Sequence, residues 1–265
     1  MQSVVKDESD FVSNVGTKSD IDVLADLPIA DAYHAEPIMV SKGVWRWRHK
    51  FTNAWHKLKL RSDKGGRYLL ANENYVLGRL KSQYVPKVHG CYDCGQDRIL
   101  VSGYAKGNTL AALIREQGHA FNGYQYFVSS LIDSLVECHR SDVVHNDIKP
   151  NNIIYDGKDM LLIDFGLSLS IGADIGQLPF RGYSPSYSLP ALKEGKGQAS
   201  TDMDWYACLV VLFVTIYGQL PSVCWKKEQP ILSAFSGMLE DAAFSKLYRQ
   251  FLMLRITELD ENLNI

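Results

Sequence analysis

Short stretches in which apolar and polar residues alternate characterise the first hundred residues of the chain. Two such stretches, rich in aromatic and basic side chains, predict strands at Arg46–Phe51 and Ala54–Leu60, joined by a turn at residues 52–53. Two further strands are expected at Val88–Tyr92 and Ile99–Tyr104, on either side of a second turn. This part of the chain is therefore predicted to be rich in β-structure.

Apolar residues spaced three and four positions apart follow in the remaining segments, and this spacing predicts helices. The first helix is expected at Arg67–Leu80, and a longer helical region at Leu110–His139 is interrupted near Gly118–Gly123. Beyond Asp202 the pattern is helical again, with a proline-bearing break at Leu220–Pro230. Because strands come first and helices later, the sequence predicts an α+β fold with two lobes.

The predicted elements divide the chain into three parts. Residues 1–30 are polar with weak periodicity, and we expect either a flexible extension or a single short helix there. Residues 31–104 form the β-rich lobe and residues 105–265 the helical lobe. Within the helical lobe, short strands at Ile153–Tyr155 and Met160–Ile163 are joined by a tight turn and form a hairpin.

Composition excludes several classes of function. The chain has 265 residues, 46% hydrophobic and 22% charged, with a net charge of −2, which argues against nucleic acid as a partner. Its longest apolar stretch, Cys208–Ile216, is too short to cross a bilayer and is expected to be a buried helix, so we predict no membrane span. The N-terminus lacks the basic and then apolar layout of a secretory signal.

The cysteines favour a reducing environment. There are five, an odd number without the spacing of a disulfide framework, which points to the cytoplasm or another reducing intracellular compartment. Cys91 and Cys94 form a single C-x-x-C pair with no second pair at metal-binding spacing, so we do not expect zinc there.

The strongest chemical signal is the segment His145–Asn152 (HNDIKPNN), followed 12 residues after Asn152 by Asp164–Gly166 (DFG). Phosphoryl transfer from a nucleoside triphosphate requires divalent cations, which prefer carboxylate and amide oxygens. Asp164 and Asn152 lie at the two ends of the predicted hairpin, which brings them close together. The same segment offers Asp147 to accept the proton of a substrate hydroxyl group.

Lys149 completes this set, because a positive charge two residues after Asp147 can stabilise the phosphoryl group as its charge moves. Each element alone occurs often by chance, since short strings of aspartate, lysine and asparagine are common. The complete segment with its hairpin is highly specific.

These motifs resemble the H-R-D-x-K-x-x-N and D-F-G motifs of eukaryotic-type serine/threonine protein kinases, and the resemblance covers roughly residues 38–255. It implies ATP bound between the lobes with Mg (or Mn), and a protein hydroxyl group as acceptor. By this match Asp147 is the catalytic base, Lys149 the phosphate-facing lysine, and Asn152 and Asp164 the metal ligands. Ser184, in a segment similar to T-P-x-Y-x-A-P-E, falls where a threonine contacts the catalytic aspartate. Asp204 resembles the buried aspartate that anchors the catalytic loop.

The resemblance also suggests residues of the β-rich lobe. Glu73 matches the glutamate of the family's αC helix, and its partner lysine should lie on the preceding strand. Lys57 and Lys59 compete for that role. We favour Lys59, because it is flanked by Leu58 and Leu60, as the family's lysine is flanked by apolar residues.

Two further parts of the nucleotide site are expected from the same match. The phosphate-covering loop is reduced to Val40–Gly43, in which Gly43 is the one glycine. The hinge between the lobes corresponds to Ser102–Ala105, where Ser102 is the gatekeeper and Tyr104 a neighbouring contact of the nucleotide. Serine is unusually small for a gatekeeper, which predicts extra space beside the purine.

The chain departs from the family at two further positions. Asn146 replaces the arginine of H-R-D, which removes the basic pocket for an activation-loop phosphate, and Ala191 replaces the glutamate of A-P-E. Casein-kinase-like and vaccinia-related kinases, and compact kinases of viruses and bacterial effectors, share such departures. The last two groups would act inside a host cell.

Two alternatives from other functional classes remain. A pseudokinase that serves as a binding or scaffold module would agree with the reduced glycine loop, although the catalytic residues are retained. A small-molecule kinase would agree with the metal ligands but lacks a use for the segment around Ser184. The sequence gives no indication of the physiological substrate or the oligomeric state.

Overall fold

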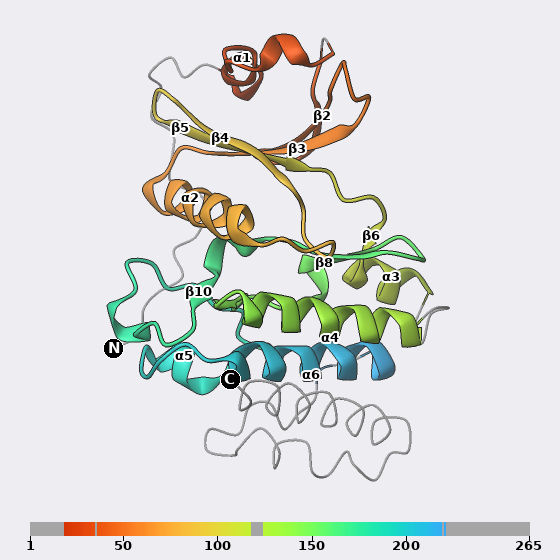
Figure 1. Ribbon diagram of the computed structural model, residues 1–265, viewed down its shortest axis with the longest axis vertical. Helices are drawn as coiled ribbons and strands as arrows, with labels where there is room; N and C mark the ends of the chain where they lie inside the picture. The colour runs from red at the N-terminus through yellow and green to blue at the C-terminus, as the bar shows by residue number, and fades with distance from the viewer. Residues whose placement is uncertain (1–18, 35, 118–123, 219, 221–265) are drawn as a thin grey trace.

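A computed structural model describes residues 19–34, 36–117, 124–218 and 220 of the chain. Within these ranges the chain forms a smaller lobe built on a β-sheet and a larger lobe of helices, shown one above the other in Figure 1. The predicted α+β fold with two lobes is thereby confirmed.

The smaller lobe contains an antiparallel sheet of five strands in the order β1-β2-β3-β5-β4. The strands are β1 (Ile38–Ser41), β2 (Val44–Arg48), β3 (Trp55–Arg61), β4 (Val88–Cys94) and β5 (Asp97–Gly103). Four of them coincide with predicted strands to within a few residues, whereas β1 lies where only the phosphate-covering loop was expected.

Side chains alternate between the two faces of this sheet, and each face packs against a helix. On the outer face, Leu58 and Leu60 pack with Val23 and Leu24 of α1 (Asp20–Ala25). The outer face also carries a short 3-10 helix, η1 (Ala30–Ala32). Of the two alternatives expected for residues 1–30, a short helix is present in their described part as α1, which joins the core of the smaller lobe.

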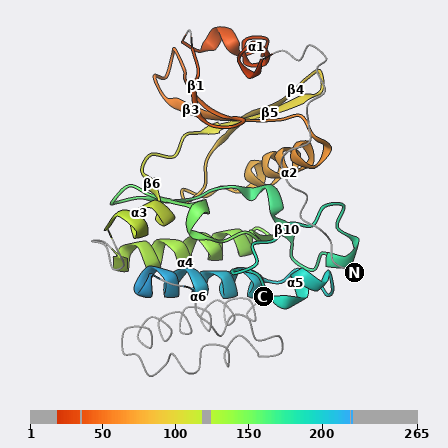
Figure 2. The same ribbon diagram turned by 180° about the vertical axis from the view of Figure 1, so that it is seen from behind.

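The inner face of the sheet carries α2 (Lys64–Arg79), which both views show between the sheet and the helical lobe (Figures 1 and 2). Asp63 caps this helix by accepting a hydrogen bond from the backbone nitrogen of Gly66 at 2.7 Å. Leu70, Val76 and Leu77 are buried, as the predicted helical spacing requires. The polar residue Glu73 is buried among them.

Helices and short strands make up the larger lobe. Its helices are α3 (Leu110–Gln117), α4 (Tyr124–Arg140), α5 (Pro190–Glu194) and α6 (Thr201–Tyr217), with 3-10 turns η2 (Pro150–Asn152), η3 (Phe165–Leu167) and η4 (Ile175–Gln177). One small sheet has the order β6-β8-β9, from β6 (Asn108–Thr109), β8 (Ile153–Tyr155) and β9 (Met160–Leu162). A second pairs β7 (Val143–Val144) with β10 (Leu169–Ser170).

The core of the larger lobe lies where α4 and α6 pack beneath the β8–β9 hairpin. Residues 203–213 of α6 are all buried, which agrees with the buried helix expected at Cys208–Ile216. No helix in the described part of the chain is long and apolar enough for a membrane crossing. The predicted breaks at Gly118–Gly123 and Leu220–Pro230 fall largely or wholly outside the described residues.

Candidate active site

A cleft of about 470 Å³ lies between the two lobes. On the side of α2 it is lined by Glu73 and Asp164, and on the other side by the segment Ser102–Ala105, which joins the lobes (Figure 1). The remaining apolar lining comes from both lobes: Val40, Val44, Pro86, Ala112, Ile154 and Ile163. Such a cleft suits a ligand with a flat apolar part and a charged part.

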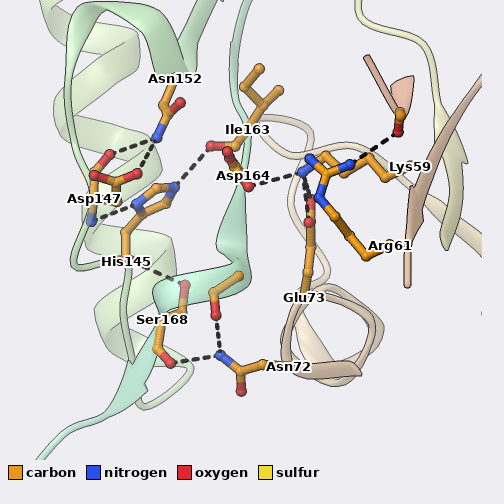
Figure 3. Close-up of polar contacts among 12 residues, drawn as sticks. Lys59, Arg61, Asn72, Glu73, His145, Asp147, Asn152, Ile163, Asp164 and Ser168 are labelled. Carbon is orange, nitrogen blue, oxygen red and sulfur yellow. Dashed lines mark hydrogen bonds and ion pairs between the residues drawn. The ribbon is translucent and has the colours of Figure 1, made fainter. Parts of the chain in front are cut away.

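Lys59 joins three elements on the α2 side of the cleft (Figure 3). Its ammonium group donates to both carboxylate oxygens of Glu73, at 2.8 and 2.7 Å, and to Asp164 at 2.9 Å. Burial alone would lower the pKa of Lys59, but the charges of Glu73 and Asp164 raise it. Strand β3, helix α2 and the D-F-G segment are thus held together by one cation.

Asp164 has an unusual backbone conformation and an ionised side chain that lines the cleft. Its φ of 72° lies in the left-handed region, which is uncommon for a residue other than glycine. Burial by itself would raise the pKa of Asp164, but the charge and hydrogen bond of Lys59 lower it to about 2. The carboxylate is therefore ionised at neutral pH, and its side chain remains 48% exposed to the cleft.

Lys57 lies on the same face of β3, two residues before Lys59. It is directly opposite Ser102 on β5 and lines the cleft. Burial, followed by the charge of Lys59, lowers the pKa of Lys57 to about 8. Of the two competing lysines, Lys59 is thus the one bonded to Glu73.

The HNDIKPNN segment places a second polar group on the larger lobe. Asp147 accepts hydrogen bonds from Lys149 at 2.7 Å, from the hydroxyl group of Ser184 at 2.7 Å, and from the amide of Asn152 at 2.8 Å. Lys149 also donates to the Ser184 hydroxyl at 3.1 Å. The structure therefore brings together the predicted base, lysine, asparagine and serine.

Asp204 on α6 holds this segment from below. Its carboxylate accepts hydrogen bonds from the backbone nitrogens of His145 and Asn146, both at 2.8 Å, and it also contacts His139 at 3.0 Å. Asp204 is fully buried, and these bonds satisfy a charge that would otherwise be costly there. Its role is structural, as the resemblance implied.

His145 packs edge-on against Phe165, with ring centroids 4.5 Å apart, and its Nε2 lies 3.1 Å from the carbonyl oxygen of Ile163. Asn146, with a φ of 65°, donates through its side chain to the carbonyl oxygen of Leu167 at 3.0 Å. An uncharged amide therefore bonds the segment after D-F-G at the position where the family has arginine.

Asn72 of α2 is a residue that the sequence did not reveal. Its amide donates to the carbonyl oxygens of Gly166 and Ser168, both at 2.9 Å (Figure 3). It thereby bonds α2 directly to the segment after Asp164. No sequence pattern marks this role, because the acceptors are backbone atoms more than ninety residues away.

Gly43 lies outside the cleft lining. It forms a tight turn between β1 and β2 with a φ of 64°, and its carbonyl oxygen accepts from the guanidinium of Arg61 at 3.1 Å. A Cβ atom at this position would lie only 2.7 Å from Arg61. Val40, Ser41 and Val44 line the cleft in its vicinity. Of the predicted cofactor contacts, Glu73, Ser102 and Tyr104 line the cleft. Gly43 and Lys59 are not among its lining residues, but Lys59 is bonded to Glu73 and Asp164, which are.

The residues present fit a hard divalent cation. Asn152 uses its amide nitrogen for Asp147, which leaves its carbonyl oxygen available, and Asp164 supplies an ionised carboxylate. No group of three or more His, Cys, Asp or Glu side chains within the described ranges is arranged to hold a metal ion. A cation here would take one or two protein ligands and share the oxygens of a bound phosphate, which is typical of Mg²⁺.

Comparison with known proteins agrees with this geometry. The family model described as "Protein kinase domain" matches residues 40–250. The chain is 29% identical to the SNF1-like protein kinase ssp2 of Schizosaccharomyces pombe over 143 residues, 54% of this chain and 25% of that protein. It is 28% identical to the carbon catabolite-derepressing protein kinase of Saccharomyces cerevisiae over 166 residues, 62% and 26% of the two chains.

A third relative, serine/threonine protein kinase OSK3 of Oryza sativa subsp. indica, is 36% identical over 127 residues, 47% of this chain and 25% of that protein. The matched part thus spans about a quarter of the length of each of these relatives. The family model, in contrast, covers most of this chain, and the resemblance seen in its motifs is confirmed. The chain belongs to the protein kinase family of eukaryotic type.

Proposed function

We propose that the chain is an active serine/threonine protein kinase that transfers the γ-phosphoryl group of ATP to a protein hydroxyl group in the presence of Mg²⁺ or Mn²⁺. One observation carries the proposal. Asn152 and Asp164 line the same cleft; Asn152 is hydrogen-bonded to Asp147, and Lys59 is bonded to Glu73 and Asp164. All polar parts that the reaction requires are therefore present in one arrangement.

Each residue has a separate task in this proposal. Asp164 and Asn152 hold the divalent cation, which neutralises phosphate charge when it is bound. Lys59, positioned by Glu73, donates to the phosphates of the nucleotide. Asp147 orients the substrate hydroxyl group and accepts its proton as the new O–P bond forms and the bond to the ADP leaving group breaks. Lys149 stabilises the negative charge of the phosphoryl group during transfer.

The acceptor is proposed to be serine or threonine in a protein. Ser184 bonds both Asp147 and Lys149, at 2.7 and 3.1 Å, so the segment that would cradle a peptide is attached to the catalytic loop. The relatives in yeast and rice bear the names of protein kinases. The odd number of cysteines, without the spacing of a disulfide framework, supports a reducing intracellular compartment.

The test is an assay with γ-labelled ATP, a generic protein substrate and either Mg²⁺ or a chelator. We expect label in protein only when Mg²⁺ is present, and loss of most turnover but retention of ATP binding in Asp147→Ala. Nucleotide binding without any transfer would favour a pseudokinase. Transfer to small hydroxyl compounds but not to protein would favour a small-molecule kinase.

A further inference from the structure

Lys57 is a cation in the cleft that the proposed chemistry does not use. It points to the same side of the sheet as Lys59, and it is paired across the strands with Ser102 on β5 and Arg46 on β2. Within the described ranges the ammonium group of Lys57 makes no hydrogen bond and no ion pair, whereas that of Lys59 has two carboxylate partners.

An ammonium group that is half-buried and lacks a partner is unfavourable in the empty protein. Burial, and then the charge of Lys59, lowers the pKa of Lys57 to about 8, against the smaller opposing effects of Glu73 and Asp164. Such a group gains most from a ligand that supplies a hydrogen-bond acceptor inside the cleft. The question is which part of a nucleotide would lie beside it.

The shape of a purine nucleotide answers this. Its triphosphate belongs near Lys59 and Asp164, and its flat base belongs among the apolar residues toward Ser102–Ala105. The edge of the base that carries position 6 lies opposite the bond to the sugar, and so faces this connecting segment. Lys57 lies about 7 Å from Lys59 along the strand, on the side of Ser102. Because Lys57 is paired with Ser102 and both line the cleft, a base bound in this way would place its position 6 nearest to these two side chains.

On this basis we propose that Lys57 lets the cleft accept 6-oxo purine nucleotides, such as guanosine or inosine triphosphate, at least as well as ATP. An ammonium group has three donors and no acceptor. The ammonium group can donate to the oxygen at position 6 of a 6-oxo purine. The 6-amino group of adenine is itself a donor, so it cannot accept a hydrogen bond from Lys57. The inference rests on the proposed function, because it assumes that a nucleotide occupies this cleft.

The backbone of Ser102–Ala105 does not discriminate between 6-oxo and 6-amino purines. A peptide segment offers both N–H donors and C=O acceptors, so it can pair with either type of purine edge. The hydroxyl group of Ser102 likewise donates or accepts. At pH 7, below its pKa of about 8, Lys57 is mainly an ammonium group and therefore mainly a donor. The discrimination between the two types of purine is therefore assigned to Lys57.

The experiment compares ATP with inosine triphosphate, because the two share ribose and triphosphate and differ at position 6 and at the N1 proton. Dissociation constants are measured by calorimetry with the full chain and Mg²⁺. We expect inosine triphosphate to bind at least as tightly as ATP. In Lys57→Met the ratio of the two constants should shift toward ATP by roughly tenfold, the usual effect of one hydrogen bond to a charged group.

Two further variants keep the result interpretable. Lys57→Gln presents both donors and an acceptor, and should give a ratio between those of the wild type and Lys57→Met. Lys87→Met removes an exposed lysine of the same lobe and should leave the ratio unchanged.

An unchanged ratio in Lys57→Met, or equal weakening of both nucleotides, would overturn the inference and assign Lys57 to the phosphates or to no contact. The proposed function would survive either of these results. Failure of the wild-type chain to bind any purine triphosphate would overturn both proposals, so the two failures are distinguishable.

Discussion

The side-chain amide of Asn72 lies 2.9 Å from the carbonyl oxygen of Ser168 and donates a hydrogen bond to it. A second bond of the same length runs to Gly166, so two hydrogen bonds connect α2 to the segment after Asp164. Since α2 also carries Glu73, these bonds help to hold Glu73 where Lys59 can reach it. The assembled arrangement of the site thus depends on contacts between α2 and the D-F-G segment.

Asn72→Asp should lower turnover by up to roughly thirtyfold. The aspartate has nearly the same shape but cannot donate, and two lost hydrogen bonds of about 1 kcal/mol each shift the population away from the assembled arrangement. Steady-state kinetics check this, with Asn74→Asp on the same helix as the matched control. Equal rates for both variants would show that Asn72 does not position α2.

Activity should not require phosphorylation of the segment between Asp164 and Ser184. Asn146 carries no charge with which to hold a phosphate, and instead bonds Leu167 directly. Assays before and after phosphatase treatment of the purified chain should give equal rates. A large loss of rate that autophosphorylation restores would contradict this.

Lys59→Met should reduce phosphoryl transfer from ATP far more than Lys57→Met. Lys59 is bonded to Glu73 and Asp164, whereas Lys57 has neither of these bonds. Loss of Lys59 also leaves Glu73 buried without its partner, so thermal unfolding of both variants should accompany the rate measurements. A fully active Lys59→Met would transfer the phosphate-binding role to Lys57.

Much of this site could be predicted, because its residues lie close together in the sequence. His145–Asn152 and Asp164 flank one hairpin, and the chemistry of phosphoryl transfer fixes the residue types at its two ends. Glu73 could be found from the resemblance of its segment to the family's αC helix. Its partner could be narrowed to Lys57 and Lys59, which lie on the same face of one strand, and the apolar neighbours of Lys59 favoured the latter.

The rest depends on contacts that leave no local pattern. Asn72 donates to backbone carbonyl oxygens, which every residue possesses. The residue types at positions 166 and 168 therefore do not predict this contact. The polar composition of the N-terminal segment concealed that Val23 and Leu24 would cover the sheet. Gly43 was predicted as a phosphate contact from the match to the family's loop, whereas its hydrogen bond with Arg61 depends on strand register and leaves no pattern in the sequence.

The smaller lobe should lose stability in mild acid through His56. Burial, and then the nearby His89 and His49, lowers the pKa of His56 to about 4, below its unfolded value near 6.5. Above pH 6.5 both states are neutral. As the pH falls below 6.5 the unfolded chain binds a proton that the folded chain excludes, so stability is lost toward pH 4.

Urea unfolding at pH 7 and pH 5 measures this effect, which we expect to be about 1–2 kcal/mol. In His56→Gln, whose side chain can still form a hydrogen bond with Tyr33, the pH dependence should become smaller. His34→Gln, at an exposed position of the same lobe, should keep it. An unaltered pH dependence in His56→Gln would show that other groups cause the acid sensitivity.

The most direct test of the central claim is the rate of phosphoryl transfer from ATP to protein in Asp164→Asn, with Mg²⁺ present. This substitution removes the negative charge from the proposed metal ligand while preserving the size of the side chain and its position beside Lys59. The proposed function predicts that transfer is abolished while the melting temperature stays close to that of the wild type. A folded Asp164→Asn that transfers phosphate at nearly the wild-type rate would contradict it.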